Sequence, residues 1–185
     1  AHQMVSAEYE FRFADGRIVT DRSAVVEGAS AGHGIGRVWI YEDVTAERRI
    51  SAQLISMAER DPLTNIFNRR RFHEELERTL ADAARRGVEV GLLGIDLDGF
   101  KPVNDAFGHQ AGDEVLIKLV DRVASIVRRN EMFFRIGGDE FAVLVPDTRA
   151  SELSELANRL CEAIAGLRFE FDGQPASVTA SIGIA

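Results

Sequence analysis

Alternating apolar and polar residues open the chain and predict a small antiparallel sheet. Three aromatic residues alternate with polar ones, namely Tyr9, Phe11 and Phe13. Asp15-Gly16 then supplies a hairpin turn, and a second strand is predicted over residues 17–26. A Gly-, Ala- and Ser-rich stretch at 28–36 leads to a third predicted strand at 37–41. Three strands cannot enclose a core alone, so they belong either to a larger domain or to a β cap on a neighbouring domain.

Residues 45–60 predict a helix, because the segment lacks Pro and Gly and is rich in Ala, Glu, Arg, Gln and Leu. Ile50, Leu54 and Met57 are spaced four and then three residues apart, as in the seam of a coiled coil. That is barely one heptad. Two interpretations therefore stay open, a dimerising signalling helix or an amphipathic helix packed on its own chain.

The remainder, which begins after a helix break predicted at Asp61-Pro62, alternates helical and strand patterns. Apolar residues at helical spacing predict three helices, over residues 70–86, 112–129 and 151–167. Apolar runs predict four strands, over residues 88–97, 132–136, 141–145 and 178–185. Gly137-Gly138 joins the middle two strands as a hairpin, and Asp172-Gly173 turns the chain toward the last one. The order predicts an α+β fold with a mainly antiparallel central sheet flanked by helices.

Net charge and composition exclude several classes of protein. The formal net charge of -8 argues against a sequence-independent DNA or RNA binder, which would carry a basic stripe. The chain has no apolar run near the ~18 residues of a membrane span, and its start lacks a secretory signal pattern. Cys161 is the only cysteine and is expected to be a small buried residue. We therefore expect a soluble, cytoplasmic chain with no membrane contact of its own.

Two pairs of acidic residues are candidates for chemistry. Asp96 and Asp98 stand two apart at the end of a predicted strand, so they share one face of the sheet. Such carboxylates repel each other unless a cation lies between them, and Mg²⁺ binds through one or two carboxylates plus substrate phosphates. Asp139 and Glu140 follow Gly137-Gly138, where the missing β-carbons allow a backbone and a ligand to approach closely. If that hairpin lies beside Asp96, the two acidic pairs form one site.

Together these segments resemble the GGDEF family of diguanylate cyclases. The signature is Gly137-Gly138-Asp139-Glu140-Phe141. The segment before it is Asp96-Leu97-Asp98-Gly99-Phe100-Lys101-Pro102-Val103-Asn104-Asp105, with Phe107-Gly108-His109 and Gly112-Asp113. Asp61-x-Leu63-Thr64…Asn68-Arg69-Arg70 and Ser181-Ile182-Gly183-Ile184-Ala185 match the family's opening and late motifs, so the resemblance covers residues 61–185.

The resemblance implies that two GTP molecules condense to cyclic di-GMP and two pyrophosphates in a homodimer, one GTP on each facing domain. Asp96, the Leu97 carbonyl and Asp139 would bind Mg²⁺ or Mn²⁺. Glu140 would assist as an acidic partner, in proton removal or as a further metal contact. The sequence does not divide these roles between Asp139 and Glu140.

Further residues would bind the nucleotide. Phe100 and Lys101 fall where family members hold phosphates, and Gly137 and Gly138 allow close approach. Asn104 and Asp113 fall on the guanine-reading positions. A carboxylate accepts from the N1–H and N2–H donors of guanine, so GTP is favoured over ATP. His109, in a helix-entry turn, ranks below them as a substrate contact.

Two departures from the family pattern affect regulation and activity. The inhibitory product motif R-x-x-D is replaced by Arg128-Arg129-Asn130-Glu131, so Arg128 and Glu131 form a degenerate site, expected to bind product more weakly. Alternatively, Arg128 and Arg129 complement the C-terminal dipole of their predicted helix. Family domains also continue after the late motif with a helix and a Lys-x-x-x-Arg pair. Residues 1–185 alone are therefore expected to be weakly active or inactive.

The resulting division has three parts. Residues 1–44 resemble the C-terminal portion of a PAS sensor domain, through a hairpin, Gly36-Arg37-Val38-Trp39 and Asp43-Val44-Thr45. Residues 45–60 form the linker helix, and residues 61–185 the catalytic domain without the family's C-terminal helix. A rival reading is a non-catalytic module that senses GTP or cyclic di-GMP and regulates an attached phosphodiesterase or partner.

Overall fold

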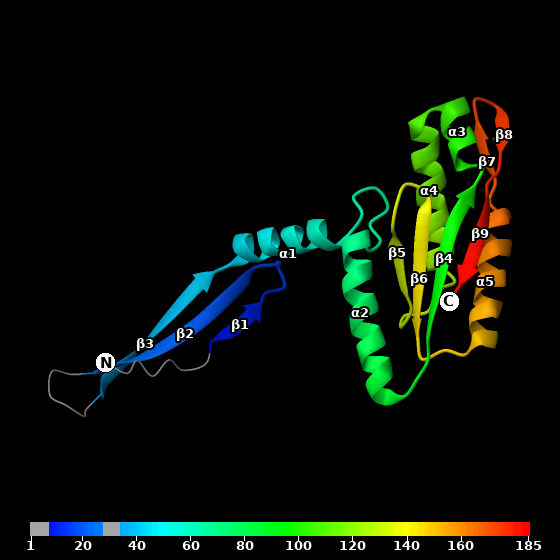
Figure 1. The fold of residues 1–185 in the computed structure, drawn as a ribbon. Helices are drawn as coiled ribbons and strands as arrows, with labels where there is room; N and C mark the ends of the chain where they lie inside the picture. The colour runs from blue at the N-terminus through cyan, green and yellow to red at the C-terminus, as the bar shows by residue number, and fades with distance from the viewer. Residues whose placement is uncertain (1–7, 28–33) are drawn as a thin grey trace. The chain divides into compact units, whose positions relative to one another are not determined.

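The computed structural model describes residues 8–27 and 34–185, and the chain divides into two compact units, residues 1–56 and 57–185 (Figure 1). Most of the Gly-, Ala- and Ser-rich stretch predicted at 28–36 lies outside the described residues. Within the described part of the chain, no helix is long and apolar enough to cross a membrane.

The first unit contains the predicted three-stranded sheet. Its strands are β1 (Tyr9–Arg12), β2 (Ile18–Glu27) and β3 (Gly34–Asp43), antiparallel in the order β1-β2-β3. Gly16 adopts a left-handed φ of 86°, and the Phe13 N–H donates to the Arg17 carbonyl at 2.9 Å. The predicted hairpin turn is therefore confirmed.

Helix α1 (Thr45–Glu59) follows the sheet and confirms the helix predicted over residues 45–60, while its role as a linker stays a prediction. Its first residue is held by the sheet, because the Ile18 N–H donates to the Thr45 hydroxyl oxygen at 2.8 Å. No residue of α1 is buried. Ile50, Leu54 and Met57 are 57%, 62% and 79% exposed, so the apolar spacing found in the sequence has no partner within the described residues.

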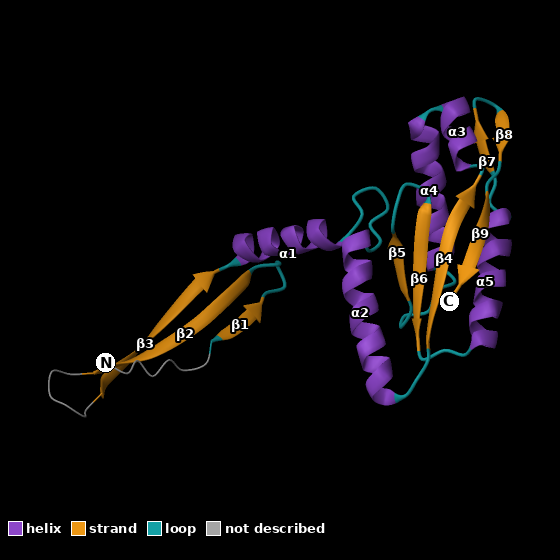
Figure 2. Cartoon of the chain, in the orientation of Figure 1, coloured by secondary structure: helices purple, strands orange, loops and turns teal. Residues whose placement is uncertain are grey.

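The second unit has the predicted α+β architecture. Its helices are α2 (Arg69–Arg86), α3 (Phe100–Phe107), α4 (His109–Ala124) and α5 (Ala150–Ala165). Its main sheet contains β4 (Val90–Asp98), β5 (Met132–Arg135), β6 (Glu140–Pro146) and β9 (Thr179–Ile184). The strands are antiparallel in the order β5-β6-β4-β9, with helices beside the sheet as Figure 2 shows. A separate hairpin joins β7 (Phe169–Phe171) to β8 (Gln174–Ala176).

Two apolar layers cover the sheet. The larger core packs α4 and α5 against one face, through residues such as Leu93, Leu119 and Leu160, all fully buried. The smaller one packs α2 over β5 and β6 around Phe134, whose ring lies 5.4 Å from that of Phe72. Strand β4 therefore alternates strictly, with the odd residues from Leu93 to Leu97 buried and the even residues from Gly94 to Asp98 exposed.

Helix boundaries and one helical face differ from the predictions. The row of Phe72, Leu76, Leu80 and Ala84 does not stay on one face, and Leu80 is 51% exposed. Each i+4 step overshoots a full turn by about 40°, so the row winds away from the sheet and Ala83 takes the buried place.

Helix α3 was not predicted, and the helix predicted over 112–129 is instead α4, which ends at Ala124. Arg128 and Arg129 thus lie beyond the helix, and the interpretation that they complement its C-terminal dipole is wrong. A short strand, β8, also precedes the last strand that was predicted.

Asn68 joins the end of α1 to the start of α2. Its side-chain oxygen accepts from the Arg71 N–H at 3.0 Å, which caps α2. Its side-chain nitrogen donates to the carbonyls of Ala58 at 3.0 Å and Arg60 at 3.3 Å, and its backbone N–H donates to Glu59 at 2.8 Å. One side chain therefore satisfies groups at both helix ends.

Replacing Asn68 with Ala is expected to lower the free energy of unfolding by about 1–2 kcal/mol, because it removes the cap and two further hydrogen bonds. Urea denaturation followed by far-UV circular dichroism measures this. Asn68→Asp keeps an acceptor for the Arg71 N–H but loses both donated bonds, so it should lie between Ala and wild type. Equal stability of Asn68→Ala and wild type would contradict the double cap.

Candidate nucleotide and metal site

A row of polar residues crosses the exposed face of the sheet near the end of β4. The strand register places Asp96 opposite Glu140 on β6 and opposite Ser181 on β9. Directly opposed residues of antiparallel strands have β-carbons about 4.5–5.5 Å apart, so the Asp96 and Glu140 carboxylates are neighbours. A cavity of about 590 Å³ opens at this row, and Gly94 and Gly183 are among its lining residues.

The Gly137-Gly138 hairpin lies beside the end of β4, as the sequence led us to expect. The Leu97 N–H donates to the Asp139 carbonyl at 3.3 Å, and the Ile136 N–H donates to the Glu140 carbonyl at 2.8 Å. A β-carbon on Gly137 would lie 2.6 Å from a Glu140 carboxylate oxygen. A larger residue at this position would therefore displace the Glu140 carboxylate from its place beside the hairpin. The structure brings Leu97 and Asp139 together through their backbones, and Asp96 and Glu140 through the strand register.

The chemistry of these donors fits a divalent cation. Asp98 accepts hydrogen bonds from Thr179 and Ser181, whereas no described side chain donates to Asp96. Two neighbouring carboxylates without donors repel each other unless a cation lies between them. Among the described residues, no group of three or more His, Cys, Asp or Glu side chains converges for a metal. A cation held here would take waters or substrate phosphates as further ligands.

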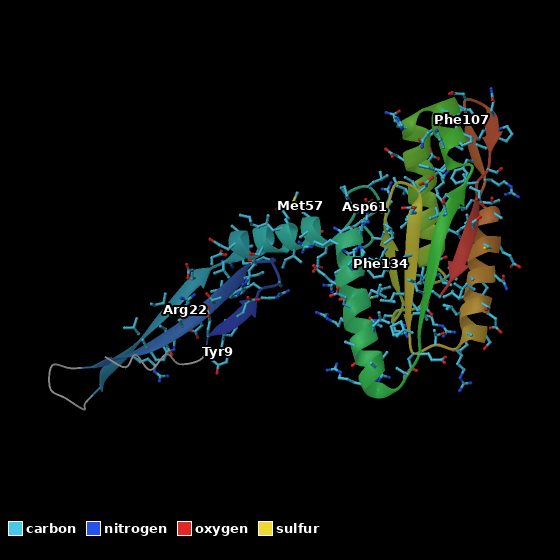
Figure 3. The ribbon with its side chains drawn as sticks, in the orientation of Figure 1. Tyr9, Arg22, Met57, Asp61, Phe107 and Phe134 are labelled. Carbon is cyan, nitrogen blue, oxygen red and sulfur yellow. The ribbon has the colours of Figure 1, made fainter. Side chains whose placement is uncertain are left out.

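Helix α3 begins at this end of β4 and presents backbone donors. Gly99 precedes it with a left-handed φ of 83°, and no side chain caps the helix. The N–H groups of Phe100 and Lys101 therefore have no intrahelical acceptor, which is the arrangement that binds anions. Buried Val103 anchors the helix, and so does Phe107, labelled in Figure 3, whose ring lies 5.4 Å from that of Phe171. Lys101 is exposed and forms no ion pair with any described carboxylate.

Asn104 on α3 lies against Gly112 on α4, the residue before Asp113. A β-carbon on Gly112 would overlap the Asn104 side-chain amide, so a larger residue there would force that amide to move. Asn104 is half-buried and Asp113 is exposed. An amide can donate and accept and a carboxylate accepts, so the two side chains offer a donor and acceptors to a ligand edge. His109 is the exposed first residue of α4.

Arg135 was missed by the sequence analysis, although it stands two residues before the glycine pair. Its side chain is only 13% exposed, and it donates to the Asp61 carboxylate at 2.9 Å. The same guanidinium donates to the carbonyls of Gly137 at 3.1 Å and of Gly138 at 2.8 Å. Asp61, in the loop before α2 (Figure 3), is therefore tied to the hairpin that carries the acidic pair. The spacing R-x-G-G was the available signal.

Comparison with known proteins decides the family. The family description "Diguanylate cyclase, GGDEF domain" matches residues 58–185. The chain belongs to this family. It is 37% identical over 153 residues to the probable diguanylate cyclase DgcE of Escherichia coli, which covers 83% of this chain and 14% of DgcE. It is 32% identical over 178 residues to the cyclic di-GMP phosphodiesterase NbdA of Pseudomonas aeruginosa, covering 88% of this chain and 22% of NbdA.

Solved structures agree with this assignment. The coiled coil and GGDEF domain of DgcB from Caulobacter crescentus, in complex with c-di-GMP, aligns with a TM-score of 0.71 at 28% identity. The alignment covers 76% of this chain and 75% of the DgcB chain. The chain spans only 14% of the length of DgcE and 22% of the length of NbdA. The PAS-like character of residues 1–44 stays a prediction.

The segment Arg128-Arg129-Asn130-Glu131, which the sequence led us to compare with the product motif, forms a closed turn. Glu131 accepts a hydrogen bond from the Arg128 N–H at 2.6 Å, and its side chain is only 5% exposed. The Arg128 side chain is 71% exposed, with Nε 3.9 Å from the Glu131 carboxylate. The arginine side chain is therefore mostly exposed to solvent, whereas the acid accepts a hydrogen bond from the Arg128 backbone.

The GGDEF domain should lose the stability that ionised Asp61 contributes when the pH becomes acidic. Burial alone would raise the pKa of Asp61, but hydrogen bonds from Thr64 and the charge and hydrogen bond of Arg135 outweigh it, so the pKa lies below its ordinary value. A carboxyl with a depressed folded pKa adds stability that is complete above its unfolded pKa of about 3.9 and is lost as the pH falls through the folded pKa.

The difference in unfolding free energy between wild type and Asp61→Asn should therefore be constant from about pH 5 to 7 and shrink below about pH 4. Urea denaturation across this range measures it. Arg135→Lys keeps the positive charge without the planar guanidinium, so its unfolding free energy should fall less in acid than that of wild type. A difference that stays constant down to pH 2.5 would contradict the role of the ion pair.

Proposed function

We propose that this protein is a diguanylate cyclase, which condenses two GTP molecules to cyclic di-GMP and two pyrophosphates in a homodimer. The observation that carries the proposal is the meeting of Asp96 and Glu140 across the strand register, beside the hairpin of Asp139. An Asn104–Asp113 pair, suited to guanine, occupies the same domain. Family membership supports the same chemistry.

Asp96, the Leu97 carbonyl and Asp139 would hold Mg²⁺, or Mn²⁺ with the same oxygen ligands. Bound there, the ion would neutralise charge on the triphosphate as the reaction proceeds. Glu140 is the acid directly opposite Asp96, so it is placed to accept a proton or to add a ligand. Asp139 contacts β4 through its backbone carbonyl, whereas Glu140 lies opposite Asp96 in the strand register. This difference favours separate roles for Asp139 and Glu140.

The chain's own groups would bind and orient the substrate. The free N–H groups of Phe100 and Lys101, with the Lys101 ammonium, would hold phosphate oxygens. Gly137 and Gly138 would let the phosphates approach the hairpin closely. In the reaction the 3′-oxygen of one GTP bonds to the α-phosphorus of the other, and the bond to pyrophosphate breaks. The hydroxyl proton leaves to a carboxylate, for which Glu140 is the candidate.

Guanine selectivity follows from Asn104 and Asp113. The carboxylate would accept the two N–H donors of the guanine edge, while the amide would contact the base from α3. Adenine would leave the Asp113 charge unpaired, which costs about 1–3 kcal/mol. His109, at the start of α4, is a weaker candidate for a substrate contact.

A homodimer is required because each GTP serves as both nucleophile and electrophile, and each domain offers one such guanine site. The exposed residues Ile50, Leu54 and Met57 of α1 are suited to pair with a second copy. We propose that residues 1–44 form part of a PAS-like sensor whose signal passes through residues 45–60 to the catalytic residues 61–185. Its GTP substrate implies that the catalytic part works in the cytoplasm.

A second candidate is a GGDEF module that binds GTP or cyclic di-GMP without turnover and regulates an attached phosphodiesterase. This second candidate is supported by the similarity of the chain to the cyclic di-GMP phosphodiesterase NbdA. The candidate acids at 96, 139 and 140 and the guanine-reading pair are all present, which favours the cyclase. Turnover separates the two, because the regulatory module would bind GTP and leave it unchanged.

Full-length protein incubated with GTP and Mg²⁺ is expected to form cyclic di-GMP and pyrophosphate, resolved by chromatography, and to form no cyclic dinucleotide from ATP. Asp139→Ala and Asp96→Asn should lower the rate by about 10²-fold or more, the usual cost of losing electrostatic stabilisation of the transition state. Asp121→Asn, an exposed acid on α4 away from these residues, is the matched control. Bound but unconverted GTP would instead establish the regulatory module.

Cyclic di-GMP titrated into the same assay is expected to inhibit weakly, and Arg128→Ala should remove the inhibition. Arg129→Ala is the neighbouring control. Glu131→Asp should be inhibited at roughly tenfold lower product concentration, since a well-placed charge-assisted hydrogen bond is worth about 1.5–3 kcal/mol. Rates that stay unchanged at saturating product would show that Arg128 and Glu131 form no product site.

A further inference from the structure

Three hydrogen-bond contacts from β9 converge on the Asp98 carboxylate at the end of β4. The Ser181 hydroxyl lies 3.0 Å from Oδ1 and 3.2 Å from Oδ2, and the Thr179 hydroxyl lies 3.1 Å from Oδ2. An ionised carboxylate only accepts hydrogen bonds, so both hydroxyls donate to it. Both oxygens of Asp98 therefore already have donors from the protein.

Asp96 has the opposite environment, although it stands on the same exposed face of the same strand. The register places Ser181 opposite Asp96 and Thr179 opposite Asp98. The Ser181 hydroxyl nevertheless turns diagonally to Asp98, and Asp96 receives no hydrogen bond from any described side chain. The two aspartates of the D-x-D segment are thus distinguished by β9. Asp98 accepts hydrogen bonds from the protein, whereas Asp96 accepts none from a described side chain and is available to a cation.

A purely structural explanation is that these bonds fasten the start of β9 to the end of β4. Thr179 and Asp98 are the last paired residues of the two strands, so a contact there would reduce fraying. It does not account for Ser181, whose own partner in the register is Asp96. The register brings Ser181 opposite Asp96, yet its hydroxyl contacts both oxygens of Asp98.

We propose that Ser181 and Thr179 are positioning residues for the metal site, a proposal that rests on the proposed metal-dependent cyclase function. By satisfying Asp98 they keep its carboxylate out of the coordination of the ion and leave Asp96 as the one aspartate of the pair that binds metal. The late motif that begins at Ser181 on β9 thereby helps to select the metal ligand on the neighbouring strand β4.

The choice of Asp96 over Asp98 matters because Mg²⁺ binds few carboxylates. Mg²⁺ is held by one or two carboxylates and completes its octahedron with waters and substrate phosphates. Without the two hydroxyls, Asp98 becomes free to join Asp96 on the ion. A further carboxylate strengthens binding of the bare ion but takes a position that a phosphate oxygen would fill. The hydroxyls are therefore expected to weaken binding of the ion alone and to favour its binding with nucleotide.

The test measures binding of Mn²⁺ alone to the full-length protein, by electron paramagnetic resonance of the free ion. Thr179→Val combined with Ser181→Ala removes both hydroxyls with little change in shape. It should tighten Mn²⁺ binding about tenfold, which corresponds to about 1.4 kcal/mol for the added carboxylate ligand. Adding Asp98→Asn should restore the wild-type Kd, and so should the hydroxyl-keeping pair Thr179→Ser and Ser181→Thr. In turnover, the double variant should raise KM for GTP more than it lowers kcat.

The outcomes separate this inference from the proposed function. If the double variant lowers only the melting temperature and leaves the Mn²⁺ Kd unchanged, the hydroxyls are structural and the inference is wrong. If Asp98→Asn alone weakens Mn²⁺ binding as much as Asp96→Asn does, Asp98 is a ligand and the inference is again wrong, while the cyclase function stands. If wild type neither binds Mn²⁺ nor converts GTP, the proposed function fails and the inference with it.

Discussion

The guanidinium of Arg135 ties the start of the GGDEF domain to its signature hairpin, and the position of the acidic residues depends on this contact. The side chain is only 13% exposed, so most of its charge is out of water and needs hydrogen-bond partners. Those partners are Asp61, where the chain enters the domain, and the carbonyls of Gly137 and Gly138 in the signature hairpin. The position of the acidic pair is thereby fixed relative to the segment that follows α1.

Register is the second constraint, and it decides which acids meet. Strand β4 buries every second residue against α4 and α5, so its polar residues must all lie on the other face. A slip of one residue would bury Asp96 and expose Leu97, and the apolar core forbids it. The row of Glu140, Asp96 and Ser181 is a consequence of this packing. The site is therefore built on strands held by the core, which suits chemistry that needs fixed distances.

Small residues permit the close approaches that the site needs. Gly112 makes room for the Asn104 amide beside Asp113, and Gly137 makes room for the Glu140 carboxylate. A β-carbon in either place would force the neighbouring amide or carboxylate to move. Glycine costs backbone entropy, so its use at these positions trades stability for the geometry of the site.

The sequence alone determined the fold class, the central antiparallel sheet, most helices and the acidic segments that identify the family, because these follow from local periodicity and motif spacing. It did not predict α3, whose eight residues are too few to be stable without packing through Val103 and Phe107. Nor did it show that Thr179 and Ser181 hydrogen-bond to Asp98, or that Arg135 lies between Asp61 and the hairpin. Those arrangements depend on contacts between residues 74 to 83 positions apart, which only the tertiary structure brings together.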